Sequence, residues 1–242
     1  MTDNYFVDAH THIVPCVDDG STSLDASIKM IEEEIGMGVK TILCTPHYRK
    51  GMFESDNELI EINFKALCDK VKELGLDVKL YLGREIYVNS IHGGYERTLD
   101  RIRSGEVKGY NNTNNYLLEF SYTKEIDIGE VAYSMNTNGF TPVIAHIERY
   151  TYLVDDLEKI YDIKNNGGII QVNASSIIGK DGFRIKRYTK KLLENDLVDI
   201  ISSDIHENRV NYFKKAYDYI GKKFNKELAD KLFFENPIKL IK

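Results

Sequence analysis

The chain has 242 residues, of which 42% are hydrophobic and 29% are charged, and its formal net charge is -6. This composition argues against disorder, and the length suits a single domain spanning residues 1–242. The negative charge disfavours nucleic-acid binding, and no stretch approaches the roughly 20 apolar residues needed for membrane insertion.

Short β-rich runs alternate with helix-sized segments from one end of the chain to the other. This alternation predicts repeated βα units with right-handed crossovers, in either a closed parallel barrel or an open doubly wound sheet. No proline-rich or serine-rich linker divides the chain, which favours one domain. The seven predicted strands are Tyr5–Asp8, Thr41–Cys44, Val78–Leu82, Tyr116–Glu119, Thr141–Ala145, Gly168–Val172 and Val198–Ser203.

Apolar residues with helical period mark the helices between these strands. The first runs from Leu24 to Ile35 behind Ser23 as a candidate N-cap, and the next from Ile60 to Leu74. Residues 88–115 are the least regular stretch and are predicted to include a long loop. Further helices are predicted near residues 157–163, 212–220 and 226–233.

Five of the six histidines and three acidic residues lie at or just past the ends of predicted strands, and Asp19 lies in the first loop. In a barrel these strand ends share one face, so the nine side chains are expected to converge. Imidazoles and carboxylates together suit several closely spaced divalent cations. His92 lies in the irregular stretch and is left outside this set. The nine candidate metal ligands are His10, His12, Asp19, His47, Glu85, Glu119, His146, Asp204 and His206.

Bound cations would also explain how an acidic chain attracts phosphate. Three divalent ions would outweigh the charge of the four ligand carboxylates, so the loaded site would attract a phosphate dianion. Arg149 and Arg209 each follow a candidate histidine ligand by three residues, and a guanidinium fork matches phosphate oxygens. The alternative is an ordinary ion pair, for example between Arg149 and Glu148. Residues 48–53 form either a loop that grips a phosphorylated aromatic side chain or a solvated turn.

The cysteines and the N-terminus predict a cytoplasmic protein without thiolate chemistry. Cys16, Cys44 and Cys68 have no CxxC spacing, and MTDNYFVDAHTH lacks the basic and apolar regions of a secretory signal. A cysteine-dependent phosphatase would need the pattern C-x5-R. Cys44 is followed by TPHYRK, which places Lys50 at the position of the arginine, so thiolate catalysis is excluded.

Six motifs fall in order along the chain from Asp8 to His206. They are DAHTHIVPCVDDGS, TPHYRKGMFE, GREIY, LLEFS, VIAHIERY and SSDIH. Together they resemble the polymerase-and-histidinol-phosphatase (PHP) superfamily. More narrowly, the DDG turn, the HYRKGMFE loop and HIERY resemble the bacterial manganese-dependent protein-tyrosine phosphatases encoded with capsule and exopolysaccharide genes.

The resemblance implies a TIM-like fold, a distorted seven-stranded parallel β/α barrel, with three divalent metal ions. Manganese is the metal that the family favours, and the ligand types also suit Fe, Zn or Mg. A hydroxide bridging two ions would attack the phosphorus, while Arg149 and Arg209 contact the phosphate. By analogy, one ion is held by His10, His12, Glu85 and Asp204, a second by Glu85, Glu119 and His146, and a third by Asp19, His47 and His206.

The implied substrate is the phosphorylated tail of a cognate bacterial tyrosine kinase that controls polysaccharide synthesis. Three alternatives stay open: a small-molecule phosphatase acting, for example, on histidinol phosphate, an amidohydrolase of the HxH barrel class, and a non-catalytic kinase-binding regulator. Glu85 stands where many amidohydrolases use a carbamylated lysine, which counts against the second. The composition is also compatible with a homo-oligomer.

Overall fold

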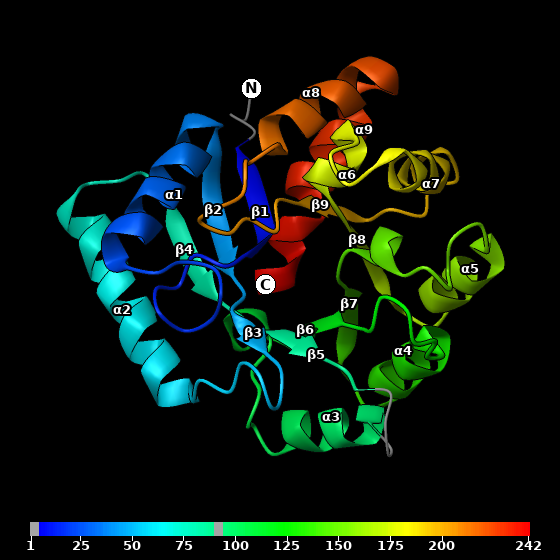
Figure 1. Ribbon diagram of the computed structural model, residues 1–242, viewed down its shortest axis with the longest axis horizontal. Coiled ribbons are helices and arrows are strands. Elements are labelled where there is room, and N and C mark those ends of the chain that lie inside the picture. The colour runs from blue at the N-terminus through cyan, green and yellow to red at the C-terminus, as the bar shows by residue number, and fades with distance from the viewer. Residues whose placement is uncertain (1–4, 90–93) are drawn as a thin grey trace.

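The β-rich runs form parallel strands at the centre of the molecule, and the helices lie around them (Figure 1). The structure is a computed structural model that describes residues 5–89 and 94–242. One sheet has the order β1 (Phe6–Thr11), β2 (Val39–Cys44) and β4 (Lys79–Leu82). The other has the order β3 (His47–Tyr48), β5 (Glu85–Tyr87), β6 (Asn115–Glu119), β7 (Thr141–Ile144), β8 (Ile169–Asn173) and β9 (Ile200–Ser202).

A strand is present at each of the seven predicted places, and the α/β class with parallel sheets is confirmed. The strands form two sheets because two long strands are each interrupted by two residues. One is divided into β2 and β3, and the other into β4 and β5. The Gly83 N–H, just after β4, donates to the carbonyl of Cys44, the last residue of β2, at 2.8 Å, so the two interrupted strands stay hydrogen-bonded where they break. At the other edge, the Asp204 N–H donates to the His10 carbonyl at 2.9 Å, so the chain after β9 lies beside β1.

Helices follow the strands in the predicted alternation. The Ser23 side chain accepts a hydrogen bond from the Ala26 N–H at 3.2 Å, which confirms the predicted N-cap of the first helix. In the described part of the chain, no helix combines the length and the apolar character needed to cross a membrane. The helices are α1 (Leu24–Gly36), α2 (Asn57–Glu73), α3 (Gly94–Arg103), α4 (Ile128–Thr137), α5 (Leu157–Asn165), α6 (Ala174–Ile178), α7 (Phe183–Glu194), α8 (Phe213–Lys223) and α9 (Lys226–Asp230).

The described residues of the stretch 88–115 are more regular than the sequence suggested. It contains α3, which buries Leu99 and Ile102, and a short turn of 3-10 helix, η1 (Tyr110–Asn112). Residues 94–103 are therefore helical, whereas residues 104–114, which connect α3 to β6, are irregular apart from η1 and form the loop that was expected in this stretch. His92 lies outside the described residues.

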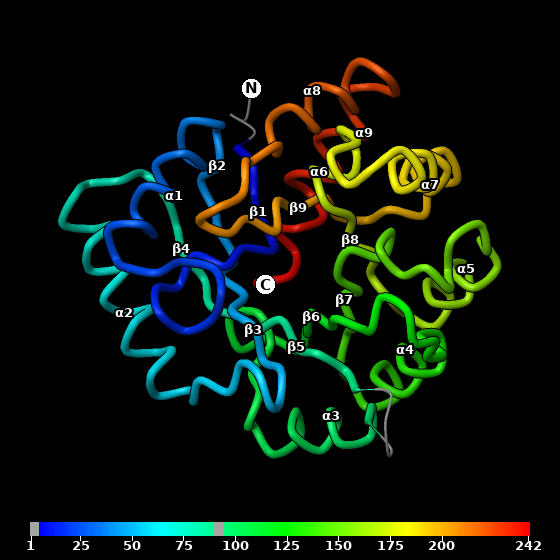
Figure 2. Tube along the Cα trace, in the orientation of Figure 1, coloured from blue at the N-terminus to red at the C-terminus, as the bar shows by residue number. Residues whose placement is uncertain are grey.

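Strand alternation separates two apolar clusters. Leu117 of β6 belongs to the smaller cluster, whereas its neighbours Tyr116 and Leu118 belong to the larger one, which packs against the helices. The smaller cluster includes Leu240 of the C-terminal segment η4 (Pro237–Ile241), and Figure 2 shows this segment near the centre of the strands. Asn115, the first residue of β6, donates to the Leu240 carbonyl at 2.9 Å. The C-terminal segment therefore packs at the amino ends of the strands, which leaves the carboxyl ends for the site.

Candidate metal centre

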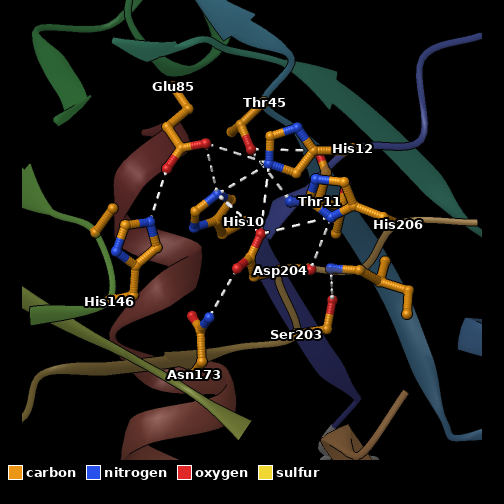
Figure 3. A network of polar contacts seen from close by, with 12 residues as sticks. His10, Thr11, His12, Thr45, Glu85, His146, Asn173, Ser203, Asp204 and His206 are labelled. Carbon is orange, nitrogen blue, oxygen red and sulfur yellow. Dashed lines mark hydrogen bonds and ion pairs between the residues drawn. The ribbon is translucent and has the colours of Figure 1, made fainter. Parts of the chain in front are cut away.

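The structure brings all nine candidate ligands together at the carboxyl ends of the strands. Close-up Figure 3 shows His146 and, beside it, the rings of His10, His12 and His206 facing the carboxylates of Glu85 and Asp204. His10 lies within β1, whereas the sequence placed it just after that strand. Three overlapping groups have ligand atoms within 4.8 Å of one another: His12, Asp19, His47 and His206; His10, His12 and Glu85; and His47, Glu85 and Glu119.

Glu85 lies at the centre of this cluster. One of its carboxylate oxygens, Oε2, is 3.2 Å from Nε2 of both His10 and His12 and 2.9 Å from Nδ1 of His47. The other, Oε1, is 3.0 Å from Nε2 of His146. One buried carboxylate therefore faces four imidazoles.

Several of these buried atoms have no hydrogen-bond partner. Leaving a buried polar atom without a partner is costly, so native proteins rarely do so without a functional reason. Lone pairs that converge without hydrogen-bond geometry fit divalent metal ions, and imidazole with carboxylate is a donor set that such ions accept. The unpartnered atoms among the candidate ligands are His47 Nδ1, Glu85 Oε2, Glu119 Oε2, His146 Nδ1 and His206 Nε2.

The buried carboxylates at the centre remain ionised. Burial alone would raise the pKa of Glu85, but attraction to His10 and His47 outweighs it and holds this pKa well below its usual value. Burial opposes ionisation of Asp204 in the same way, and His10 and Arg149 lower its pKa more strongly. Both carboxylates can therefore bind a cation near neutral pH without first losing a proton.

Metal affinity is expected to rise with pH because other ligands carry protons near neutrality. Burial, followed by repulsion from Glu85, raises the pKa of Glu119 to about 7. Burial lowers the pKa of His12, but Asp18 and Glu85 raise it well above its usual value. Calorimetry should give a Mn²⁺ dissociation constant roughly tenfold lower at about pH 8 than at about pH 6, with proton release on binding. Equal affinity and no proton release would contradict these protonation states.

Asp18 positions two of the candidate ligands, a role that the sequence did not indicate. Its Oδ2 lies 2.8 Å from His12 Nδ1 and accepts from the His47 N–H at 2.9 Å. Position 20, two residues after Asp18, requires glycine because the backbone there closely approaches His12. A Cβ at this position would lie 2.1 Å from the His12 carbonyl oxygen. The DDG turn therefore holds His12, which directly follows β1, together with His47 of β3, while Asp19 faces the cavity.

Gln171 and Asn173 of β8 position ligands on the opposite side. The Gln171 Oε1 accepts from the His146 N–H at 2.7 Å and lies 3.3 Å from His10 Nδ1. The Asn173 Nδ2 donates to Asp204 Oδ2 at 2.8 Å. Two polar residues alternating at the end of an apolar strand, in the order IIQVN, are the signal that could have revealed them.

Two candidate ligands hold a strained backbone. His146 and Asp204 have φ angles of 31° and 53°, in the left-handed region that residues other than glycine rarely adopt. Such strain costs on the order of 1–3 kcal/mol and persists where surrounding contacts fix the conformation. Both residues come shortly after a strand, and the strained backbone directs their side chains into the cluster.

The two predicted phosphate-binding arginines both contact Asp204. Nη1 of Arg149 lies 3.2 Å from Asp204 Oδ2, and Nη1 of Arg209 lies 3.4 Å from the same oxygen. Arg149 is 19% exposed and Arg209 is 48% exposed, so Arg149 is the more firmly held. The Glu148 carboxylate, the alternative partner for Arg149, instead accepts from the Asn173 N–H and the Ser176 hydroxyl.

A cavity of about 280 Å³ opens over the cluster and has aromatic walls. The Phe53 ring stacks on the His47 ring with centroids 5.0 Å apart and an angle of 11°. Tyr122 lies with its ring edge-on to His146 at 5.6 Å, and Met52 also lines the cavity. The mouth therefore combines candidate metal ligands, two arginines and apolar surface.

The chain is similar to known proteins over almost its full length. Residues 6–242 match the family described as capsular polysaccharide synthesis, CpsB/CapC. The chain is 35% identical to the tyrosine-protein phosphatase CpsB of Streptococcus agalactiae, over 98% of both chains. It is 31% identical to the putative tyrosine-protein phosphatase CapC of Staphylococcus aureus, over 88% of this chain and 82% of CapC.

The fold also matches a solved structure. That structure comes from work on YwqE of Bacillus subtilis and CpsB of Streptococcus pneumoniae, described there as metal-dependent tyrosine phosphatases. The TM-score is 0.87 at 24% identity, with 97% of this chain and 94% of the other covered. The family expected from the motifs is confirmed, and the chain belongs to the CpsB/CapC family of capsular polysaccharide synthesis proteins.

Proposed function

We propose that this protein is a metal-dependent protein-tyrosine phosphatase. The observation that carries this proposal is the buried cluster of imidazoles and carboxylates with unpartnered lone pairs, beside two arginines. Relatives at 27–35% identity are named tyrosine-protein phosphatases, which supports the same reaction. The substrate class is therefore phosphate monoesters of tyrosine side chains.

The proposed cofactor is a set of three divalent ions, with Mn²⁺ as the preferred metal. Bound there, such ions would supply Lewis-acid stabilisation of negative charge and lower the pKa of coordinated water. Glu85 would be shared between two ions, because its carboxylate oxygens face different histidines. The proposed ligands are His10, His12, Glu85 and Asp204 for one ion, Glu85, Glu119 and His146 for the second, and Asp19, His47 and His206 for the third.

The two arginines act on the phosphoryl group. Asp204 orients both guanidinium groups at the edge of the cavity. Their N–H donors can then bind non-bridging phosphate oxygens and stabilise the charge that develops in the transition state. Tyrosine phosphate has a phenolate leaving group, which departs more readily than an alkoxide and so needs less help from a general acid.

Phe53 contributes selectivity for an aromatic leaving group, and we expect a measurable loss when it is removed. Its ring lines the cavity beside His47, where it can pack against the substrate ring. Phe53→Ala should lower kcat/KM for a phosphotyrosine peptide by about fivefold and change that for a phosphoserine peptide much less.

The matched control is Phe183→Ala, which removes the same atoms from a side chain that is 81% exposed at the start of α7. Equal losses on both peptides in the Phe53 variant would indicate a structural role for this ring and contradict selectivity.

The proposed setting is a cytoplasmic one, with the phosphorylated tail of a cognate bacterial tyrosine kinase as the partner. All three cysteines are free, which suits a reducing compartment. We further propose that residues 1–242 form one domain, in which the two sheets make a distorted seven-stranded barrel. The hydrogen bonds from Glu85 to Pro46, where β4 continues into β5, and from Asp204, just after β9, to His10 of β1 support this closure.

Metal analysis tests the proposed function directly. The purified protein would be analysed for bound metals, stripped with a chelator and titrated with Mn²⁺ while hydrolysis of an aryl phosphate is followed. We expect activity to vanish on chelation and to return as three equivalents bind. Full activity in the stripped protein would refute metal dependence, and saturation at one equivalent would refute the three-ion assignment.

A further inference from the structure

A strongly cationic groove of about 480 Å³ lies beside the metal cavity. Residues from the loop after β3, from α3 and from the segment after β6 line it. Within residues 5–89 and 94–242, its lining contains no carboxylate. Its five cationic side chains are Arg49, Lys50, Arg97, Arg101 and Lys124.

Arg49 connects the groove to the metal cavity, because it lines both. Its guanidinium carbon lies 4.2 Å from the centre of the Tyr87 ring, and this stacking holds the side chain at the boundary. The groove therefore adjoins the cavity, and a peptide whose phosphotyrosine enters the cavity can place a neighbouring residue in the groove.

Most of the positive charge in the groove is unneutralised. Arg101 is 3.6 Å from the Glu106 carboxylate. In the described part of the chain, no ion pair within 4.0 Å involves Lys50, Arg97 or Lys124, and all three are exposed. Arg97 and Arg101 are four residues apart on α3, so they share one face of that helix. This local charge contrasts with a whole chain of net charge -6.

The depression on the other side of the metal cavity differs in charge. It is lined by Arg149, Lys180 and Arg209, but Asp181 and Asp204 line it as well. Asp181 lies 3.4 Å from Nη2 of Arg149, so part of the positive charge there is already paired. An anionic segment is therefore attracted more strongly to the groove next to α3.

We propose that this groove binds an anionic segment of the substrate chain next to the phosphotyrosine. The chemistry it would recognise is a carboxylate or phosphoryl oxygen, supplied by acidic side chains or by a second phosphorylated tyrosine. This inference rests on the proposed function, since it assumes a peptide substrate. Lys50, Arg97 and Lys124 would determine specificity and contribute to KM without touching the reacting phosphate.

Three phosphotyrosine peptides test the groove: one with neutral flanks, one with flanking glutamates and one with a second phosphotyrosine. The metal-loaded protein should prefer the anionic peptides by roughly tenfold in kcat/KM, the size expected from a few solvent-exposed ion pairs. The preference should shrink between about 50 mM and about 500 mM salt. In the double variant Arg97→Gln/Lys124→Gln, the ratio of anionic to neutral kcat/KM should fall to about two or less.

The matched control is Lys222→Gln/Lys223→Gln, which removes two exposed charges from the end of α8 and should keep the wild-type ratio. Equal kcat/KM for the three peptides, or a ratio unchanged in the groove variant, would overturn the proposal. A preference for either anionic peptide that the groove variant loses supports it, and the two peptides show which group is bound.

Equilibrium binding separates this proposal from the proposed function. The same three peptides can be made with a non-hydrolysable phosphonate in place of the phosphate, and their dissociation constants measured by fluorescence anisotropy. Tighter binding of the anionic analogues, lost in the groove variant, supports the groove even if no peptide is hydrolysed. Equal dissociation constants would contradict binding of an anionic segment in the groove, but they would not contradict the proposed phosphatase function.

Discussion

Replacing Glu85 with glutamine is expected to lower kcat on an aryl phosphate by about a thousandfold or more, equivalent to about 4 kcal/mol of barrier. The glutamine would keep the shape of the side chain but remove the charge that His10, His12 and His47 face. An amide is also a poor bridging ligand. Metal analysis should therefore show fewer bound ions in this variant, and kcat should not recover at high Mn²⁺.

The control for this experiment is Glu194→Gln, the same change at an exposed glutamate that pairs with Lys190 on α7. It should retain wild-type metal content and activity. Circular dichroism would show that both variants are folded. A Glu85→Gln protein with full metal content and activity within a few-fold of wild type would exclude Glu85 as a shared ligand.

Replacing Arg149 with glutamine is expected to lower kcat/KM by about 100- to 1000-fold, comparable to removing one preorganised donor from a transition state. Arg149 is mostly buried and is held by Asp204 and Asp181, so its guanidinium is already oriented for the phosphate. Arg209→Gln should cost less, roughly tenfold, because Arg209 is 48% exposed and its charge is screened by solvent.

Metal content distinguishes phosphate binding from damage to the cluster. Arg149 contacts Asp204, a proposed ligand, so a variant that lost metal would lose activity indirectly. We expect the Arg149→Gln protein to bind the same number of ions and to bind inorganic phosphate more weakly. Unchanged phosphate affinity together with full metal content would contradict a direct contact with substrate.

The regular part of the fold could be predicted because it depends on local pattern. Short apolar, β-rich runs identified each strand, and their alternation with helical segments predicted parallel βα units. The interruption between β2 and β3, from Cys44 to His47, left no such signal in the sequence. It depends on hydrogen bonds to the neighbouring strand, such as the one from Gly83 to Cys44. Helix α3 was missed because its short apolar face, with Leu99 and Ile102, lies within a polar stretch.

The ligands could be predicted because parallel strands end on one face, whereas the residues that orient them could not. Gln171 contacts His10 across 161 residues of sequence, and no local pattern indicates that pairing. The sequence identified Asp19 as a candidate ligand, but it gave no sign that the adjacent and chemically similar Asp18 holds His12. That contact depends on the fold of the turn, in which Gly20 closely approaches the His12 carbonyl.

The most direct test of the account is hydrolysis of a tyrosine-phosphorylated peptide by the purified protein, beside a serine-phosphorylated peptide and histidinol phosphate. Each substrate would be assayed after chelation and again with Mn²⁺ restored. We predict turnover that is selective for phosphotyrosine, absent after chelation and recovered with Mn²⁺. Metal-dependent activity on histidinol phosphate alone would contradict the proposed substrate, and no activity with any metal would contradict the catalytic account itself.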